Sequence, residues 1–240
     1  MIRVDGRRPD QMREVRIEPN YLLHPEGSAL VEFGKTRVIC TAMVDNRVPP
    51  HIYGTGKGWL TAEYAMLPGS SAQRIQRDST RGRPNGRSQE IQRLIGRSLR
   101  TVFDADRFGQ RTMTIDCDVI QADGGTRTAA VTGACVALGL ALKRLKKESK
   151  INVDLLRDCV AGVSVGVVEG VAALDLCYLE DAQAEVDMNV VLTGDGRFVE
   201  IQGTAETAPF GGEKLNEMLD LARAGVARLI DLQREILGVD

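Results

Sequence analysis

The sequence predicts an α+β protein whose two halves repeat one plan, because each half runs from strands into a long helix. Residues 28–44 alternate apolar and polar side chains around a Gly34-Lys35 turn, which is typical of a β-hairpin. Residues 126–145 are apolar on nearly every side and predict a central buried helix. No linker-like composition separates the halves, so we expect one internally pseudo-duplicated domain over residues 1–240.

In the first half, a Pro- and Gly-containing loop over residues 45–57 leads to a strand over residues 59–66. Residues 88–103 place their apolar side chains on one face at helical spacing, with Arg93, Arg97 and Arg100 opposite. We expect a helix there. Residues 113–119 alternate strictly and predict a strand that ends just before the central helix.

The second half predicts a β-meander followed by a helix. Its expected strands cover residues 160–168, 171–178, 184–193 and 197–203, with Gly-containing turns at 169–170 and 194–196. Residues 213–237 then carry an apolar stripe at helical spacing, which predicts the last helix.

Composition excludes several classes of protein. Of the 240 residues, 43% are hydrophobic and 27% charged, which is typical of a globular protein rather than a disordered or fibrous one. The uncharged stretch at residues 128–142 is too short for a membrane span. The first residues lack the apolar core of a secretory signal, so we expect a cytoplasmic protein.

The side-chain inventory narrows the chemistry. The chain has two histidines and five singly scattered cysteines, so no zinc-ligand pattern is visible, and we expect buried, reduced thiols. No nucleophile elbow or Walker P-loop is present. Catalysis would therefore depend on carboxylates, arginines, backbone amides and a hard metal ion.

Arginine is concentrated in one region. Although the formal net charge is −2, ten arginines and no lysine lie between Arg74 and Arg111. Residues 72–87 hold five of them against one Asp, which predicts an exposed loop. Arginine makes bidentate contacts with phosphate, so the loop is a candidate phosphate contact. Surface ion pairs with acidic residues are the alternative.

The junction Gly124-Gly125-Thr126-Arg127 is a candidate anion site at the start of the central helix. A helix N-terminus presents free N–H groups and the positive end of the helix dipole. Two glycines allow an anion to approach the backbone, while Thr126 and Arg127 add donors. An ordinary turn with Asp123 or Thr126 as the helix cap remains the alternative.

An acidic pair is the second candidate site. In the strand over residues 184–193, Glu185, Asp187 and Asn189 share the face opposite the apolar residues, and Asp181 lies in the preceding connection. Asp181 and Asp187 can converge at one end of the strand, where paired carboxylates bind Mg²⁺ or act as a general acid. The alternative is a solvated strand face beside an acidic turn.

Six strings carry a resemblance that extends over almost the whole chain. They are DGRRPDQMR, GSALVEFGKTRVICT, GWLTAEY, GRSQEIQRLIGRSLR, QADGGTRTAA and EVDMNVV. Together they resemble the ribonuclease PH family of phosphorolytic 3′ exoribonucleases, which is related to polynucleotide phosphorylase and the exosome ring.

The resemblance implies a mixed-sheet fold of the ribosomal protein S5 domain 2-like type and a homo-hexamer built as a trimer of dimers. It also implies a tRNA nucleotidyltransferase reaction. Inorganic phosphate, as co-substrate, attacks the last 3′ phosphodiester of precursor tRNA or another RNA 3′ end and releases a nucleoside diphosphate. No membrane partner is expected.

The family's motifs also imply roles for individual residues. Arg87, Gly125, Thr126 and Arg127 would bind the attacking phosphate. Asp181 and Asp187 would be the catalytic carboxylates and would hold Mg²⁺. The loop arginines would contact the tRNA body; these are Arg74, Arg77 and Arg81. The region around residues 68–71 departs from the arginine-bearing form found in many members, which puts that RNA contact in doubt.

Two other functions stay open on the residues alone. A hydrolytic, metal-dependent 3′ exonuclease could use the same carboxylates and would release monophosphates. A non-catalytic RNA-binding ring subunit would not need the charged site residues. Because this chain carries Arg127 and both Asp181 and Asp187, the sequence favours an enzyme.

Overall fold

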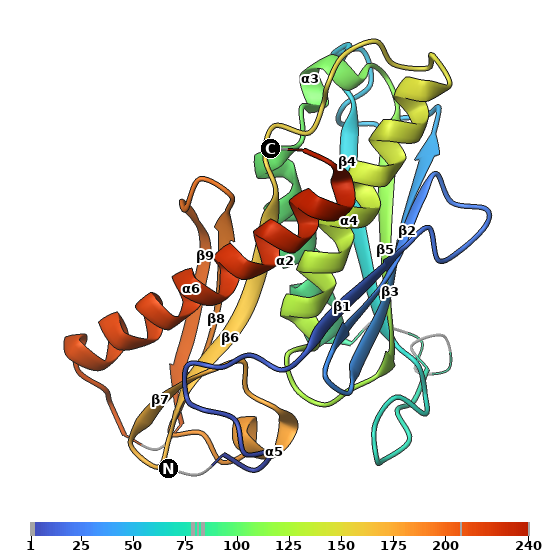
Figure 1. The fold of residues 1–240 in the computed structure, drawn as a ribbon. Coiled ribbons are helices and arrows are strands. Elements are labelled where there is room, and N and C mark those ends of the chain that lie inside the picture. Colours follow the sequence, from blue (N-terminus) through green and yellow to red (C-terminus); the bar gives the residue numbers. More distant parts are fainter. Residues whose placement is uncertain (1–2, 78–79, 81, 83–84, 207, 240) are drawn as a thin grey trace.

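A computed structural model describes residues 3–77, 80, 82, 85–206 and 208–239. It contains two sheets with long helices packed against them (Figure 1). The first sheet has five strands in the order β1-β2-β3-β5-β4, antiparallel except for the parallel pair β4/β5. The strands are β1 (Val15–Pro19), β2 (Gly27–Phe33), β3 (Thr36–Asp45), β4 (Trp59–Met66) and β5 (Thr112–Gln121). The predicted hairpin and both later strands are confirmed, whereas the sequence analysis missed β1.

The second sheet is antiparallel in the order β7-β6-β8-β9. Its strands are β6 (Val160–Val168), β7 (Val171–Leu174), β8 (Val186–Thr193) and β9 (Phe198–Ala205). The predicted meander is wrong, because β8 pairs with β6 and not with β7. β6 is buried at every position, so it is a central strand with a partner on each side.

The predicted strand 171–178 is also too long. It ends at Leu174, because Asp175 adopts a left-handed conformation with φ of 57°. The short helix α5 (Tyr178–Asp181) then precedes β8, which starts at Val186. This connection carries Asp181 to the end of β8.

Three long helices complete the fold: α2 (Gly86–Val102), α4 (Thr126–Lys147) and α6 (Gly212–Leu237). α2 begins where the Asn85 side chain accepts a hydrogen bond from the backbone N–H of Arg87, and its apolar stripe is buried as predicted. A short helix α3 (Ala105–Phe108) follows α2. α4 packs against β2, β3 and β6, and α6 against β6 and β7. Each half therefore runs from antiparallel strands into a long helix, as the sequence predicted.

α4 is the centre of the molecule (Figure 1). It is long and apolar enough to cross a membrane by length and composition, but 83% of its most apolar window is buried within the protein. One cluster of buried apolar side chains includes residues of both sheets and of all three long helices. The five cysteines are free and buried, which confirms the expectation of reduced core thiols.

Candidate active site

A polar pocket of about 320 Å³ lies where the N-termini of α2 and α4 meet α5, β8 and β9. It brings together both predicted carboxylates and two of the predicted arginines. Its lining residues are Arg87, Glu90, Arg127, Asp181, Asp187, Asn189, Gln202, Thr204 and Glu206. Sequence reasoning had singled out Arg87, Arg127, Asp181 and Asp187 as site residues.

The turn before α4 is shaped by two glycines in the left-handed region. Gly124 has φ of 77° and Gly125, the helix cap, has φ of 66°. A Cβ on Gly124 would lie 2.6 Å from the carbonyl oxygen of Leu176, so only glycine fits beside the connection to α5. Gly125 offers no side-chain cap, and neither Asp123 nor Thr126 supplies one. The N–H groups of the first turn of α4 therefore remain available to an anion.

Thr126 lies behind this turn, with 6% of its surface exposed. Its hydroxyl shares a 2.8 Å hydrogen bond with the hydroxyl of Tyr64 on β4. Burial raises the pKa of Tyr64, so this phenol stays protonated at neutral pH. The sequence places Tyr64 on a strand without indicating this contact, because the contact depends on the parallel pairing of β4 with β5, which precedes α4.

Arg127 extends from the first turn of α4, and its Nη1 donates to Oε1 of Gln202 on β9 at 2.8 Å. Gln202 in turn donates from Nε2 to Oε1 of Glu90 on α2. Arg87 is exposed at the first turn of α2. All four charged groups line the pocket, and both arginines lower the pKa of Asp181 and of Asp187.

Asp181 and Asp187 both line the pocket. Burial raises the pKa of Asp187 to about 6, and the charge of Asp181 adds to the rise, while Arg127 and Arg87 oppose it. Burial also raises the pKa of Asp181, against the charges of Arg87 and Arg127. Because the pKa values of both carboxyls are raised and Asp187 titrates near 6, Asp187 can carry a proton in mildly acidic solution, which suits it to proton transfer. The alternative of a solvated strand face is disfavoured, because both side chains are partly buried.

A buried ionic cluster fixes α5 and therefore Asp181. Arg3 donates to both carboxylate oxygens of Glu180, at 2.7 Å and 2.6 Å. Nη2 of Arg13 donates to Oδ1 of Asp175 at 2.7 Å. All four charged residues are at least 93% buried, and Arg7 also pairs with both carboxylates at 3.4 Å, so the buried charges compensate one another.

Arg13 also connects this cluster to the anion-binding turn. Its guanidinium donates to the carbonyl oxygens of Asp123 and Gly124. Thr36 donates to the same Gly124 carbonyl at 2.7 Å. These donors fix the carbonyl side of the turn, while the N–H groups of the next residues begin α4. No local pattern marks Arg3 and Arg13 as members of this cluster, because their acidic partners lie more than 160 residues away in the chain.

A metal ion would find two carboxylates in the pocket. Within the described residues, no three Asp, Glu, His or Cys side chains gather in a way that could hold a metal ion. Mg²⁺ often binds proteins through one or two carboxylates and takes its other oxygens from water and substrate phosphate. Asp181 and Asp187 fit that mode of binding.

The arginine loop lies apart from the pocket lining. Arg74 and Arg77 are exposed, as predicted, and neither lines the pocket. Arg81 lies outside the described residues. The segment leads directly into α2, whose first turn carries Arg87.

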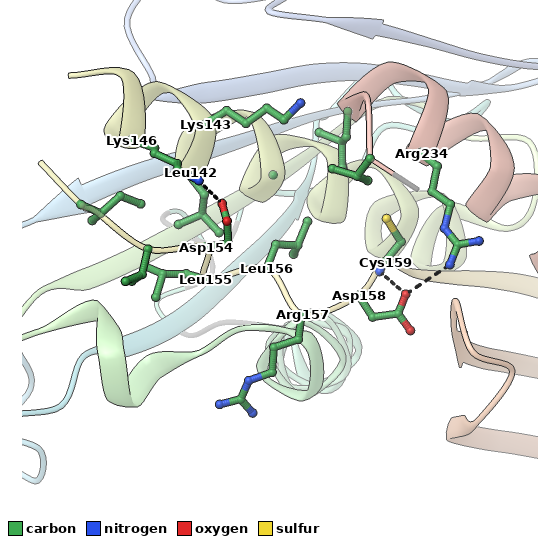
Figure 2. A pocket seen from close by; sticks show the side chains of 15 residues that line it. Leu142, Lys143, Lys146, Asp154, Leu155, Leu156, Arg157, Asp158, Cys159 and Arg234 are labelled. Carbon is green, nitrogen blue, oxygen red and sulfur yellow. Dashed lines mark hydrogen bonds and ion pairs between the residues drawn. The ribbon is translucent and has the colours of Figure 1, made fainter. Parts of the chain in front are cut away.

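A second pocket, of about 190 Å³, lies between the C-terminal ends of α4 and α6 and residues 151–159 (Figure 2). Its walls are mainly apolar. Lys146 pairs with Asp154 at 2.6 Å, and Arg234 pairs with Asp158 at 3.7 Å. It contains none of the predicted site residues, so we place the chemistry in the polar pocket.

Comparison with known proteins agrees with the motif resemblance. Residues 11–143 match the family described as "3' exoribonuclease family, domain 1", and residues 158–225 match its domain 2. Proteins named ribonuclease PH from Bacillus cereus (strain AH187) and Bacillus anthracis (strain A0248) are each 55% identical over 239 residues. These alignments cover 99% of this chain and 97% of each relative.

Two solved structures share the fold. Rice Rrp46 has a TM-score of 0.78 at 19% identity, covering 98% of this chain and 100% of that one. A chain of the Archaeoglobus fulgidus exosome with RNA bound to the active site has a TM-score of 0.79 at 22% identity, covering 96% and 92%. The expected mixed-sheet α+β architecture is therefore confirmed. On both family domains and the near-full-length relatives, this chain belongs to the ribonuclease PH family of 3′ exoribonucleases.

Proposed function

We propose that this exoribonuclease is phosphorolytic and trims the 3′ extensions of precursor tRNA. An oxygen of inorganic phosphate attacks the phosphorus of the last phosphodiester. The bond between that phosphorus and the 3′ oxygen of the preceding nucleotide breaks, and the terminal nucleotide leaves as a nucleoside diphosphate. The observation that carries the proposal is the pocket itself. It joins two arginines and a helix N-terminus to a carboxylate pair, and no Ser, Cys or His nucleophile is among its lining residues.

Phosphate brings its own charge and needs positioning more than activation. Arg87 and Arg127 can hold its oxygens, and the first N–H groups of α4 after Gly125 can donate to it. Fixing the phosphate in line with the scissile bond turns a bimolecular encounter into a step within one complex. The two cations also stabilise charge that develops on the transferred phosphoryl oxygens.

The departing 3′ oxygen needs a proton or a cation. Protonated Asp187 can donate that proton, and Mg²⁺ held by Asp181 and Asp187 would stabilise the oxygen as a Lewis acid when bound. The two roles have opposite pH dependence. If Asp187 is the acid, kcat falls as the pH rises through about 6; if it must be ionised to hold Mg²⁺, kcat rises over the same range. A pH profile at saturating phosphate and Mg²⁺ distinguishes them.

A ring would give the enzyme its hold on a large RNA. The exposed arginines at positions 74 and 77 are candidate contacts to the tRNA body. One such loop binds weakly at physiological salt, whereas several copies around one opening act together through effective concentration. The shared fold with exosome chains supports a ring, and we propose a homo-hexamer arranged as a trimer of dimers.

The decisive experiment is product analysis with a 3′-extended tRNA, with and without inorganic phosphate. We expect nucleoside diphosphates only when phosphate is present. Monophosphates formed without phosphate would show hydrolysis instead. RNA binding with no released nucleotide under either condition would show a non-catalytic subunit.

A further inference from the structure

We propose that Gln202 and Glu90 form a positioning pair that orients Arg127 for phosphate. This inference rests on the proposed phosphorolytic function and assigns a role to two residues that the sequence did not single out. Both line the polar pocket, Gln202 from β9 and Glu90 from α2. They come from opposite halves of the chain, and Gln202 contacts both Glu90 and Arg127, which lies in the first turn of α4.

The chemistry of the two partners fixes the orientation of the Gln202 amide. A guanidinium has only donors and an ionised carboxylate has only acceptors. Gln202 therefore presents Oε1 to Arg127, at 2.8 Å, and Nε2 to Glu90. A side chain held at both ends in this way cannot turn, so Glu90 determines the direction of the acceptor that Arg127 sees.

The contact leaves part of Arg127 free for an anion. Nη1 of Arg127 donates to Gln202, and within the described residues no other side-chain hydrogen bond from Arg127 is present. Nε and Nη2 together form one planar edge of the guanidinium, which matches two oxygens of a phosphate. The hydrogen bond at Nη1 therefore fixes the direction in which Arg127 presents its Nε and Nη2 edge.

The neutral character of Gln202 matters for the same reason. A carboxylate in direct contact with Arg127 would neutralise it and compete with phosphate for the same donors. In this structure the carboxylate is one step removed, at Glu90, with the amide between. Arg127 is held in place while its charge stays available to an anionic co-substrate.

α2 and β9 are joined at a second point that serves as a control. Arg97 pairs with Glu200 at 2.6 Å, on the same helix and the same strand. Neither residue lines the pocket or contacts Arg127. If the Glu90–Gln202 contact only fastened α2 to β9, loss of the Arg97–Glu200 pair would have a similar effect on phosphate use.

The test measures KM for phosphate and kcat on a short RNA oligonucleotide at saturating RNA. We expect Gln202→Ala to raise KM for phosphate about three- to tenfold, the value of one hydrogen bond, with kcat nearly unchanged. Gln202→Glu should raise it further, because its carboxylate competes with phosphate. Glu90→Ala should resemble Gln202→Ala, whereas Glu90→Gln keeps an acceptor and should restore most of the phosphate affinity.

Equilibrium dialysis with radiolabelled inorganic phosphate, without RNA, gives a second readout that does not depend on turnover. The control Glu200→Ala should leave both readouts unchanged. Unaltered phosphate affinity in Gln202→Ala and Glu90→Ala would overturn the inference, and so would an equal loss in Glu200→Ala. Failure of the proposed function is visible separately, as wild-type turnover that needs no phosphate.

Discussion

Replacing Asp187 with Asn should stabilise the folded protein at neutral pH while it removes catalysis. The folded pKa of Asp187 is about 6 against an ordinary value of 3.8, so above pH 6 the folded state carries an ionised carboxyl that it disfavours. An Asn amide is never charged and keeps the shape of the carboxyl, so the folded state no longer holds a disfavoured charge. The catalytic proton or metal ligand is lost, so turnover should fall by about two orders of magnitude or more.

The difference between 3.8 and about 6 corresponds to roughly 2–3 kcal/mol. Above pH 6, the free energy of unfolding of Asp187→Asn should exceed that of the wild type by this amount. As the pH falls from 6 towards 4, Asp187 becomes protonated in the folded state and the cost is relieved. The advantage of the Asn variant should therefore shrink to near zero over that range.

Urea unfolding at pH 4, 6 and 8 tests this at fixed protein concentration in EDTA and phosphate-free buffer. Asp195→Asn is the matched control. Arg197 and Thr193 lower the pKa of Asp195 to about 2, so that replacement should cost stability at neutral pH instead of adding it. A gain for Asp187→Asn that is the same at all three pH values, or a loss at pH 8, would refute the electrostatic argument. Wild-type turnover would remove Asp187 from the mechanism.

Four further variants probe other parts of the enzyme. Arg127→Ala and Arg87→Ala should each raise KM for phosphate about ten- to hundredfold in steady-state assays, the value of one charge-assisted contact. Replacing Arg74, Arg77 and Arg81 together with Ala should leave short-RNA cleavage nearly intact. The same triple change should flatten the salt dependence of tRNA binding by about one unit of slope per lost contact, in a protein that light scattering shows to be an oligomer. Gly124→Ala forces a side chain at φ of 77° against the Leu176 carbonyl, so denaturation should show a loss of about 2 kcal/mol or more.

The sequence predicted the parts of the site that are continuous in the chain. Gly124 to Arg127 lie at a strand-to-helix junction that alternation and apolar content identify directly. Asp187 lies on the polar face of a strand whose other face is apolar, as expected. In these cases local pattern and final structure agree, because each residue's environment is set by its own strand or helix.

The features of the fold and site that the sequence did not predict depend on pairings between distant segments. Gln202 and Glu90 look like ordinary surface residues until β9 pairs with β8 and brings one beside the other. The meander prediction failed because strand order cannot be read from alternation, and only the burial of β6 on both sides explains its two partners. β7 ends just before Asp175, and the ion-pair partner of Asp175, Arg13, lies at the other end of the chain.

That last ion pair also sets the time at which the enzyme becomes complete during synthesis. Arg3 and Arg13 leave the ribosome first, but their partners Glu180 and Asp175 are added 177 and 162 residues later. At roughly 5–20 residues per second, the delay is on the order of 10 to 30 s. During this interval the nascent chain has neither Asp181 nor a fixed carbonyl side to its glycine turn. A growing chain therefore acquires the ability to degrade RNA only after the segment that carries Asp181 and Asp187 has been added.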